Sequence, residues 1–392
     1  MGTWLDRVPL SGIVRIREMM FGVENPFRLD QGDVSFAAPD AFKAGINHAL
    51  RDDETHYTQT AGLPRLRELV IDKLRNRNQI IARTEDVLIS NGGIHGLYLV
   101  WQCLLEPDDE VILPDPWWPP VQAQVMLAHG VPVGVALREE LGWRWDLDEV
   151  ARAITPKTRA IYLNSPHNPT GGMLTRADLA AILELANRHD LMIISDEAYE
   201  DYGYDTPHVS IASLPGAAER TISVFTFSKS YAVTGLRLGY VVSPHFHDRM
   251  QKLAFYTASN VCTAVQRGGI EMLEAGRAAV DEFAAEIARR RTLFFDAIAE
   301  ASHGTVTGAM PAGGMFAFLP IAKDWRSHAK HETPAEASPS WAYAEYLIRR
   351  GRIGCVPGID FGPHGETHVR FCVAREPAEL AGALASLREI FV

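Results

Sequence analysis

The sequence has few cysteines, no CxxC pair and no uncharged stretch at its N-terminus. The four cysteines among its 392 residues are Cys103, Cys262, Cys355 and Cys372. Such scattered thiols indicate a reducing compartment rather than a disulfide framework, so we expect a cytoplasmic protein. Charged residues run through residues 1–20, which argues against a signal peptide or a membrane-spanning segment there.

Basic residues are too few, and too dispersed, for a nucleic-acid-binding protein. Lys and Arg number 38 against 49 Asp and Glu, which gives a net charge of −11 with no basic block. We therefore expect neither nucleic acid nor a membrane as a partner. The histidine pair in HAKH (328–331) lacks a third ligand, so we also expect no metal site.

The middle of the chain alternates short apolar runs with amphipathic stretches such as residues 175–190. The apolar runs are residues 86–90, 110–115, 159–164, 191–197 and 221–227. Alternation of this kind is typical of an α/β protein whose mainly parallel sheet is covered by helices on both faces. We find no internal repeat.

A second pattern begins near residue 265, with a long helical stretch followed by further strands. Those strands are expected at residues 313–321, 354–358 and 367–374. They predict a smaller α+β domain, with the polar segment 327–343 as a loop leading into a helix. We expect an N-terminal arm that forms part of the small domain (1–45), a large domain (46–285) and a C-terminal small domain (286–392).

Polar residues with unusual requirements follow the expected strands. Asn168 begins a rigid Asn-Pro-Thr-Gly turn, although a plain turn accounts for it equally well. Asp196 leaves an apolar strand, where a carboxylate needs a cationic partner. Lys229 sits at a similar strand end, where desolvation lowers the pKa of its amine and makes it nucleophilic.

Together these residues match the requirements of one cofactor. A helix opened by a glycine pair, with Thr226, Ser228 and Arg237, suits a phosphate dianion. Asp196 suits a protonated pyridine nitrogen and Lys229 suits an imine, which are the needs of pyridoxal 5'-phosphate (PLP).

Five motifs in this order resemble the class I/II aminotransferases of PLP fold type I. They are SNGGIHGLY, NSPHNPTGG, SDEAY, FSKSYAVTGLRLGY and VRFCVA, and the resemblance extends from residue 27 to the C-terminus. It implies a large PLP-binding domain with a mainly parallel, seven-stranded sheet and a small α+β domain. Lys229 would then hold PLP as an internal aldimine and shuttle the proton, while Asp196 pairs with the pyridinium.

The resemblance also implies roles for further residues. Cofactor contacts are implied for Tyr57, Gly93, Ile94, Trp118, Asn168, Tyr199, Thr226, Ser228 and Arg237. Substrate contacts are implied for Gly32, Trp118, Asn168 and Arg370, with Arg370 clamping the α-carboxylate. Trp118 has a core position as its alternative, and Tyr57 would reach the neighbouring active site of a homodimer.

The implied activity is transfer of an α-amino group to a 2-oxo acid by a ping-pong route. Ile94 occupies a position where some bacterial aspartate-type relatives have a lysine, so neutral, aliphatic or aromatic amino acids are expected. A β-lyase, decarboxylase or oxidase on the same scaffold remains an alternative. A regulator would need a DNA-binding domain before residue 30, for which we expect no room. A degenerate binding protein is disfavoured by the intact set of site residues.

Overall fold

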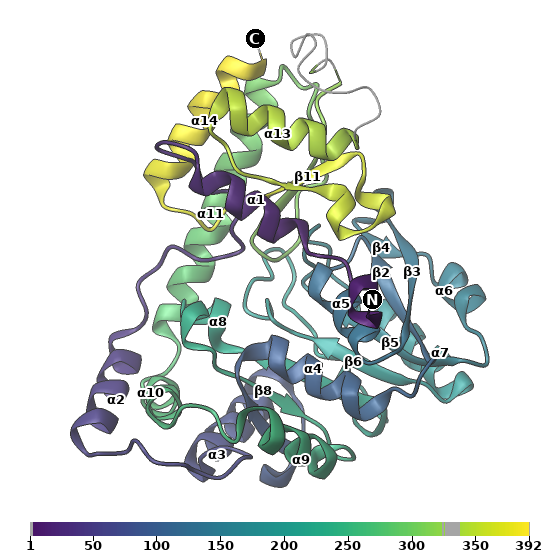
Figure 1. Cartoon of the computed structure of the whole chain (residues 1–392), viewed down its shortest axis with the longest axis vertical. Coiled ribbons are helices and arrows are strands. Elements are labelled where there is room, and N and C mark those ends of the chain that lie inside the picture. The colour runs from purple at the N-terminus through teal and green to yellow at the C-terminus, as the bar shows by residue number, and fades with distance from the viewer. Residues whose placement is uncertain (1–2, 324, 326–337, 392) are drawn as a thin grey trace.

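The chain forms a larger part around one sheet and a smaller part beside it. The computed structural model describes residues 3–323, 325 and 338–391. The small sheet, α1 (Gly12–Phe21), α13 (Pro339–Gly351) and α14 (Pro377–Phe391) lie in the upper part of Figure 1, above the large sheet. In the part of the chain that the structure describes, no helix is long and apolar enough to cross a membrane.

The large sheet has eight strands in the order β1-β8-β7-β6-β5-β2-β3-β4. Their bounds are β1 (Val87–Ser90), β2 (Glu110–Asp115), β3 (Val131–Arg138), β4 (Arg144–Trp145), β5 (Thr158–Asn164), β6 (Met192–Asp196), β7 (Thr221–Thr226) and β8 (Gly239–Val242). Strands β3, β2, β5, β6 and β7 pair in parallel, which confirms the expected mainly parallel sheet. It has eight strands rather than seven because the two-residue β4 pairs with the edge of β3.

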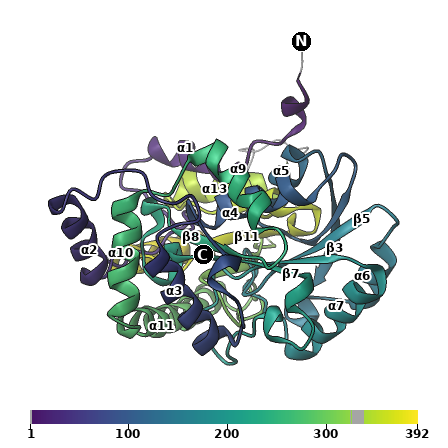
Figure 2. The ribbon, with the colours of Figure 1, turned by 90° about the horizontal axis from the view of Figure 1, so that it is seen from below.

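Helices cover both faces of this sheet, as the apolar strands require. Those of the larger part are α2 (Asp40–Arg51), α3 (Pro64–Lys73), α4 (Gly92–Leu104), α5 (Pro119–Leu127), α6 (Leu147–Ala153), α7 (Arg176–His189), α8 (Phe227–Ser230), α9 (His247–Ala258) and α10 (Thr263–Glu274). Figure 2 shows α4, α5 and α9 on one side of the strands and α6 and α7 on the other.

Helix α7 forms where the sequence predicts it, for local reasons. Thr175 caps its first turn and exchanges hydrogen bonds with Asp178, which satisfies backbone N–H groups that would otherwise lack partners. Leu179, Ile182 and Ala186 lie on one face and are buried against the sheet. The cap determines where this helix begins, and the apolar face determines which side of it packs against the sheet.

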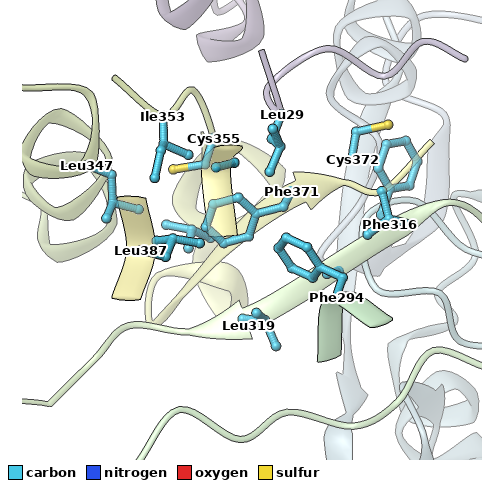
Figure 3. Packing of buried hydrophobic residues seen from close by; sticks show 14 of the residues in the cluster. Leu29, Phe294, Phe316, Leu319, Leu347, Ile353, Cys355, Phe371, Cys372 and Leu387 are labelled. Atoms are coloured by element: carbon cyan, nitrogen blue, oxygen red, sulfur yellow. The ribbon is translucent and has the colours of Figure 1, made fainter. Parts of the chain in front are cut away.

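The smaller part has its own apolar core around an antiparallel sheet. The sheet has the order β10-β11-β9, with β9 (Phe316–Pro320), β10 (Val356–Pro357) and β11 (His368–Cys372). Figure 3 shows how Phe294 of the long helix α11 (Ala278–Ala301) packs with residues from both ends of the chain, such as Leu29 and Leu387. The N-terminal segment therefore shares a core with the C-terminal one.

The division expected from the sequence falls within helices. Residue 45 lies in α2, which packs closely against α10, and residue 285 lies in α11. The expected loop at 327–343 and the HAKH histidines lie largely outside the described residues, which resume at Ser338 before α13. The domain boundaries stay predictions.

The close approach of α2 and α10 depends on glycine. A Cβ added at Gly45 would lie 2.8 Å from the carbonyl oxygen of Arg267, with backbone rather than a flexible side chain in the way. We expect Gly45→Val to lower the free energy of unfolding by about 1–3 kcal/mol, since the helices must separate. Asn47→Val, at an exposed position of the same helix, is the control. Equal urea midpoints for the two variants would contradict this packing.

Candidate active site

A cavity of about 260 Å³ opens at the carboxyl ends of the parallel strands, where ligands bind in open α/β sheets. Asn164, Asp196 and Thr226 end the neighbouring strands β5, β6 and β7 and all line it. The sequence-predicted residues that line the cavity are Gly32, Gly93, Ile94, Trp118, Asn168, Asp196, Tyr199, Thr226, Ser228, Lys229, Arg237 and Arg370. Only Tyr57, of the predicted set, does not.

Asp196 is a buried carboxylate held by two donors. Its Oδ2 accepts a hydrogen bond from the hydroxyl of Tyr162 at 2.7 Å, and its Oδ1 accepts one from the backbone N–H of Ala198 at 3.1 Å. Burial raises the pKa of Asp196 to about 6, although both hydrogen bonds favour the charged form. The carboxylate forms no salt bridge within the described residues, so it can receive a cation from a ligand.

Next to it, Asn168, Tyr199 and Arg370 form a connected polar wall. The Asn168 side chain donates to the Tyr199 hydroxyl at 3.4 Å and accepts from Arg370 Nη1 at 3.1 Å. Burial raises the pKa of Tyr199 above its ordinary value, so its hydroxyl keeps the proton. This wall offers both donors and acceptors to oxygen atoms of a ligand.

Arg370 is a buried cation that forms no salt bridge with a carboxylate of the described residues. Its side chain is 1% exposed, and its Nη2 donates to the carbonyl oxygen of Asp30 at 2.8 Å. Its Nε has no hydrogen-bond partner, and the guanidinium lies over the ring of Phe316 at 4.4 Å. A buried charge in this state is unfavourable unless an anion completes it, so this side of the cavity suits a carboxylate.

Lys229 follows β7 in the short helix α8 and lines the cavity. Its Nζ donates to the carbonyl oxygen of Gly32. Burial lowers the pKa of Lys229, which increases the neutral, nucleophilic fraction of the amine at neutral pH. The side chain therefore combines nucleophilicity with access to a ligand.

A second anion site lies at the start of α4. Gly93 and Ile94 are in its first turn, whose backbone N–H groups have no partner within the helix. The hydroxyls of Thr226 and Ser228 are 2.9 Å apart beside it. Arg237 lines the same end of the cavity and has no carboxylate partner in the described part of the chain. Amides, hydroxyls and a guanidinium together suit a dianion such as phosphate.

Gly92 is required for this arrangement. Its φ of +76° is a conformation that residues with a side chain rarely adopt. A Cβ there would lie 2.3 Å from Nη2 of Arg237. The backbone and the guanidinium can approach each other only because residue 92 has no side chain.

A second buried carboxylate, Glu197, stabilises the turn after β6 through hydrogen bonds. Its side chain accepts hydrogen bonds from Ser195, Ser210 and His208, the last at 2.8 Å. Burial opposes ionisation of Glu197, but these partners outweigh it and keep its pKa below the ordinary value. The anchored turn holds Asp196 and Tyr199 toward the cavity.

Sequence reasoning missed several lining residues. Ile13 of α1, Leu97 of α4 and Thr234 all line the cavity, as does Asn164. Asn164 had a detectable signal, because it ends an apolar strand as Asp196 does. Ile13 had none, since its place depends on how α1 packs. Tyr57 is 87% exposed and lies outside the cavity of its own chain.

Comparison with known proteins gives the family of this chain. Residues 24–387 match the family model for aminotransferase class I and II. The chain belongs to this family. It is 34% identical to an aromatic-amino-acid aminotransferase from Thermococcus litoralis and to an aspartate aminotransferase from Pyrococcus abyssi. Each comparison covers 98% of this chain and 97% of the relative.

Solved structures agree with this assignment. The crystal structure of an aromatic aminotransferase from Pyrococcus horikoshii is 34% identical, with a TM-score of 0.87. The match covers 96% of this chain and 98% of that chain. The expectations of a PLP-dependent aminotransferase and of PLP fold type I are thereby confirmed.

The cavity fits the cofactor of this family. PLP carries a dianionic phosphate, a ring nitrogen that binds a carboxylate, a ring hydroxyl and an aldehyde that reacts with an amine. The unpaired Arg237 beside the amides of α4, the carboxylate of Asp196, and the amine of Lys229 are chemically suited to three of these groups. Within the described residues, no cluster of three or more His, Cys, Asp or Glu side chains could hold a metal ion.

Because Gly92 touches Arg237, a methyl group there tests the anion site. We expect Gly92→Ala to weaken binding of PLP to the cofactor-free protein roughly tenfold or more, the range for losing a charge-assisted hydrogen bond. Gly142→Ala is a matched control, because its φ of +71° imposes similar strain while nothing lies within 4 Å of the added methyl. Fluorescence titration measures both dissociation constants. Equal losses in the two variants would mean that strain, not Arg237, is responsible.

Proposed function

We propose that this aminotransferase moves the α-amino group of a neutral amino acid, aliphatic or aromatic, to a 2-oxo acid by a ping-pong route. The observation that carries the proposal is that one cavity is lined by the buried Asp196 and Arg370 and by the partly buried Lys229. Two of them suit the reactive ends of PLP and the third suits the substrate carboxylate.

In this proposal Asp196 binds the ring nitrogen of PLP and keeps it protonated. The bound cofactor then supplies an electron sink for the electrons left when the Cα–H bond of the substrate breaks. Asn168 and Tyr199 bind the ring hydroxyl, and Trp118 packs on the ring from the start of α5. Their contacts fix the plane of the ring relative to Lys229.

The anion site at α4 binds the phosphate. Thr226 and Ser228 donate their hydroxyls, Arg237 supplies the charge, and the amides of Gly93 and Ile94 complete the cradle. These groups would hold PLP in the cavity without relying on its covalent attachment to Lys229. Binding of the phosphate would therefore fix the position of PLP in the cavity.

Lys229 is both the covalent attachment point and the proton carrier. Its Nζ takes the proton from Cα of the substrate, which requires the neutral amine that burial favours. Arg370 and the backbone beside Gly32 hold the substrate carboxylate, so that the Cα–H bond is directed at Nζ. In this arrangement Arg370 binds the substrate carboxylate, while Lys229 transfers the proton.

The side-chain end of the cavity supports a neutral substrate. Ile13, Ile94, Leu97 and Trp118 give an apolar lining. The lining cations in the described residues are Lys229, Arg237 and Arg370, and each is already assigned. A distal carboxylate on the substrate would therefore be desolvated without a partner.

A homodimer would account for the exposure of Tyr57 and of two aromatic side chains on α9. Tyr57 is 87% exposed, and Phe255 and Tyr256 at the end of α9 are also exposed aromatic side chains. A partner subunit that covered these side chains would remove their apolar surface from water. In the proposed dimer, Tyr57 of one subunit contacts the cofactor phosphate of the other. The expected cytoplasmic location likewise stays a prediction.

A half-reaction tests the proposed function. The PLP-loaded protein is mixed with single amino acids, without an oxo acid, and the cofactor spectrum is followed. We expect aliphatic or aromatic amino acids to convert PLP fully to pyridoxamine phosphate, and Lys229→Ala to slow this at least about a thousandfold. Lys157→Ala, an exposed lysine, is the control.

The products distinguish this function from its alternatives. If the spectrum of PLP persists while ammonia, carbon dioxide or a thiol accumulates, the protein is a lyase or decarboxylase and the proposal is wrong. Hydrogen peroxide with consumption of oxygen would indicate an oxidase. A Lys229→Ala protein with undiminished turnover would refute the lysine assignment.

Ile94 offers a direct test of substrate choice, because it is 39% exposed and lines the cavity at the start of α4. We expect Ile94→Lys to raise kcat/KM for acidic relative to neutral amino acids by roughly fivefold, the effect of one new ion pair of about 1 kcal/mol. Ile81→Lys, at an 88% exposed position outside the cavity lining, adds the same charge as a control. An unchanged ratio would mean that Ile94 does not face the substrate side chain.

A further inference from the structure

Tyr162 is a buried tyrosine with no role in the mechanism above. It lies on β5 with no measurable exposure, and β5 pairs in parallel with β6. In this register Tyr162 is opposite Ile194, and Asn164 is opposite Asp196. Since residues two apart on a strand share a face, Tyr162 and Asp196 project from the same side of the sheet.

The tyrosine hydroxyl points at the cofactor-binding carboxylate. It donates to Asp196 Oδ2 at 2.7 Å, while the other oxygen accepts from the backbone of Ala198. Tyr162 is therefore the side-chain donor to this carboxylate in the described structure. The tyrosine ring packs near Trp101 of α4, with 6.1 Å between the ring centroids, in a fully buried surrounding. Such packing leaves the hydroxyl little freedom to turn away.

We propose that Tyr162 is a positioning residue: its hydroxyl orients Asp196 toward the ring nitrogen of PLP and stabilises the charged carboxylate that this nitrogen needs. This inference rests on the proposed role of Asp196. Tyr162 touches neither the cofactor nor the substrate and acts through the aspartate. A phenol rather than an apolar side chain at residue 162 thereby contributes to cofactor binding.

Electrostatics explain why a donor is needed here. Burial, with a smaller contribution from the adjacent negative charge of Glu197, raises the pKa of Asp196 to about 6. The hydrogen bonds from Tyr162 and Ala198 act in the opposite direction. Other ionisable groups around the carboxylate are Tyr199, on the same turn, and the cavity cations Lys229, Arg237 and Arg370. Loss of the tyrosine hydroxyl removes a hydrogen bond that lowers the pKa of Asp196 and so helps to keep the carboxylate charged near neutral pH.

The affinity of the site for a protonated ring depends on pH through the charge of Asp196. Asp196 binds a protonated ring as the carboxylate, so ring binding is strong above the pKa of Asp196 and is lost as pH falls through it. Without the hydroxyl, this pKa rises and the loss begins at higher pH. We expect Tyr162→Phe to shift the midpoint up by about one pH unit, which lowers affinity roughly threefold midway between the two midpoints and up to about tenfold at pH values below both.

The probe is pyridoxamine 5'-phosphate, which has the ring nitrogen and the phosphate but cannot form an imine with Lys229. Its dissociation constant for the cofactor-free protein is measured by tryptophan fluorescence from about pH 5 to about pH 8, a range that spans the raised carboxyl pKa. Tyr240→Phe is the matched control, because Tyr240 is buried in the same sheet and its hydroxyl has no hydrogen-bond partner among the residues that the structure describes. An unshifted profile for Tyr162→Phe, or an equal shift in both variants, would overturn the proposal.

A double-mutant cycle with Asp196→Asn separates positioning from general stability. We expect Tyr162→Phe to weaken binding in the wild-type background and to have no further effect beside Asp196→Asn. An undiminished effect in that background would mean a structural role only. If Asp196→Asn itself leaves affinity unchanged, the proposed function fails; if Asp196→Asn weakens binding and Tyr162→Phe does not, only this inference fails.

A measurement on the wild-type chain covers the case in which Tyr162→Phe does not fold. Infrared difference spectra between wild type and Asp196→Asn isolate the carboxyl band of Asp196 in the cofactor-free protein. A midpoint near pH 6 or lower, with a band shifted by hydrogen bonding, supports the proposal. A midpoint above about pH 7, or the band of a free carboxylate, would contradict it.

Discussion

The site depends on the register of three adjacent parallel strands. Because β5, β6 and β7 run in the same direction and pair with Asn164 opposite Asp196, their polar ends meet at one edge of the sheet. The apolar residues before those ends are buried under helices on both faces, so the strands cannot slip by one residue without turning side chains the wrong way. Packing of the core thus sets the geometry of the cavity.

Around that edge, the chain keeps several charges buried and incompletely paired. Asp196 has hydrogen bonds but no cation, Arg370 has an unsatisfied Nε, and Arg237 approaches a helix N-terminus only because residue 92 is glycine. Each is unfavourable in isolation. The phosphate and the ring nitrogen of PLP are suited to relieve Arg237 and Asp196, and the carboxylate of an amino acid is suited to relieve Arg370. The instability of these groups and the affinity for the cofactor have the same origin.

Much of this could be predicted from sequence because the relevant signals are local. Continuous apolar runs indicated β2, β5, β6 and β7, and the polar residues after them indicated the cavity. β8 is also a short apolar run, but its antiparallel pairing with β7 and β1 follows from tertiary packing and has no local signal. Ile13 reaches the cavity only through the packing of α1, and Tyr162 resembles any buried strand residue until its neighbour is known. A side chain whose role depends on a residue of a neighbouring strand gives no recognisable pattern in the sequence of its own strand.

The most direct measurement is to find the lysine that holds the cofactor. The PLP-loaded protein is reduced with borohydride, digested and analysed by mass spectrometry for the phosphopyridoxyl group. The account predicts the label on Lys229, whose amine is buried in the cavity and has a lowered pKa. Label on another lysine, or no label on a protein that still transaminates, would contradict it.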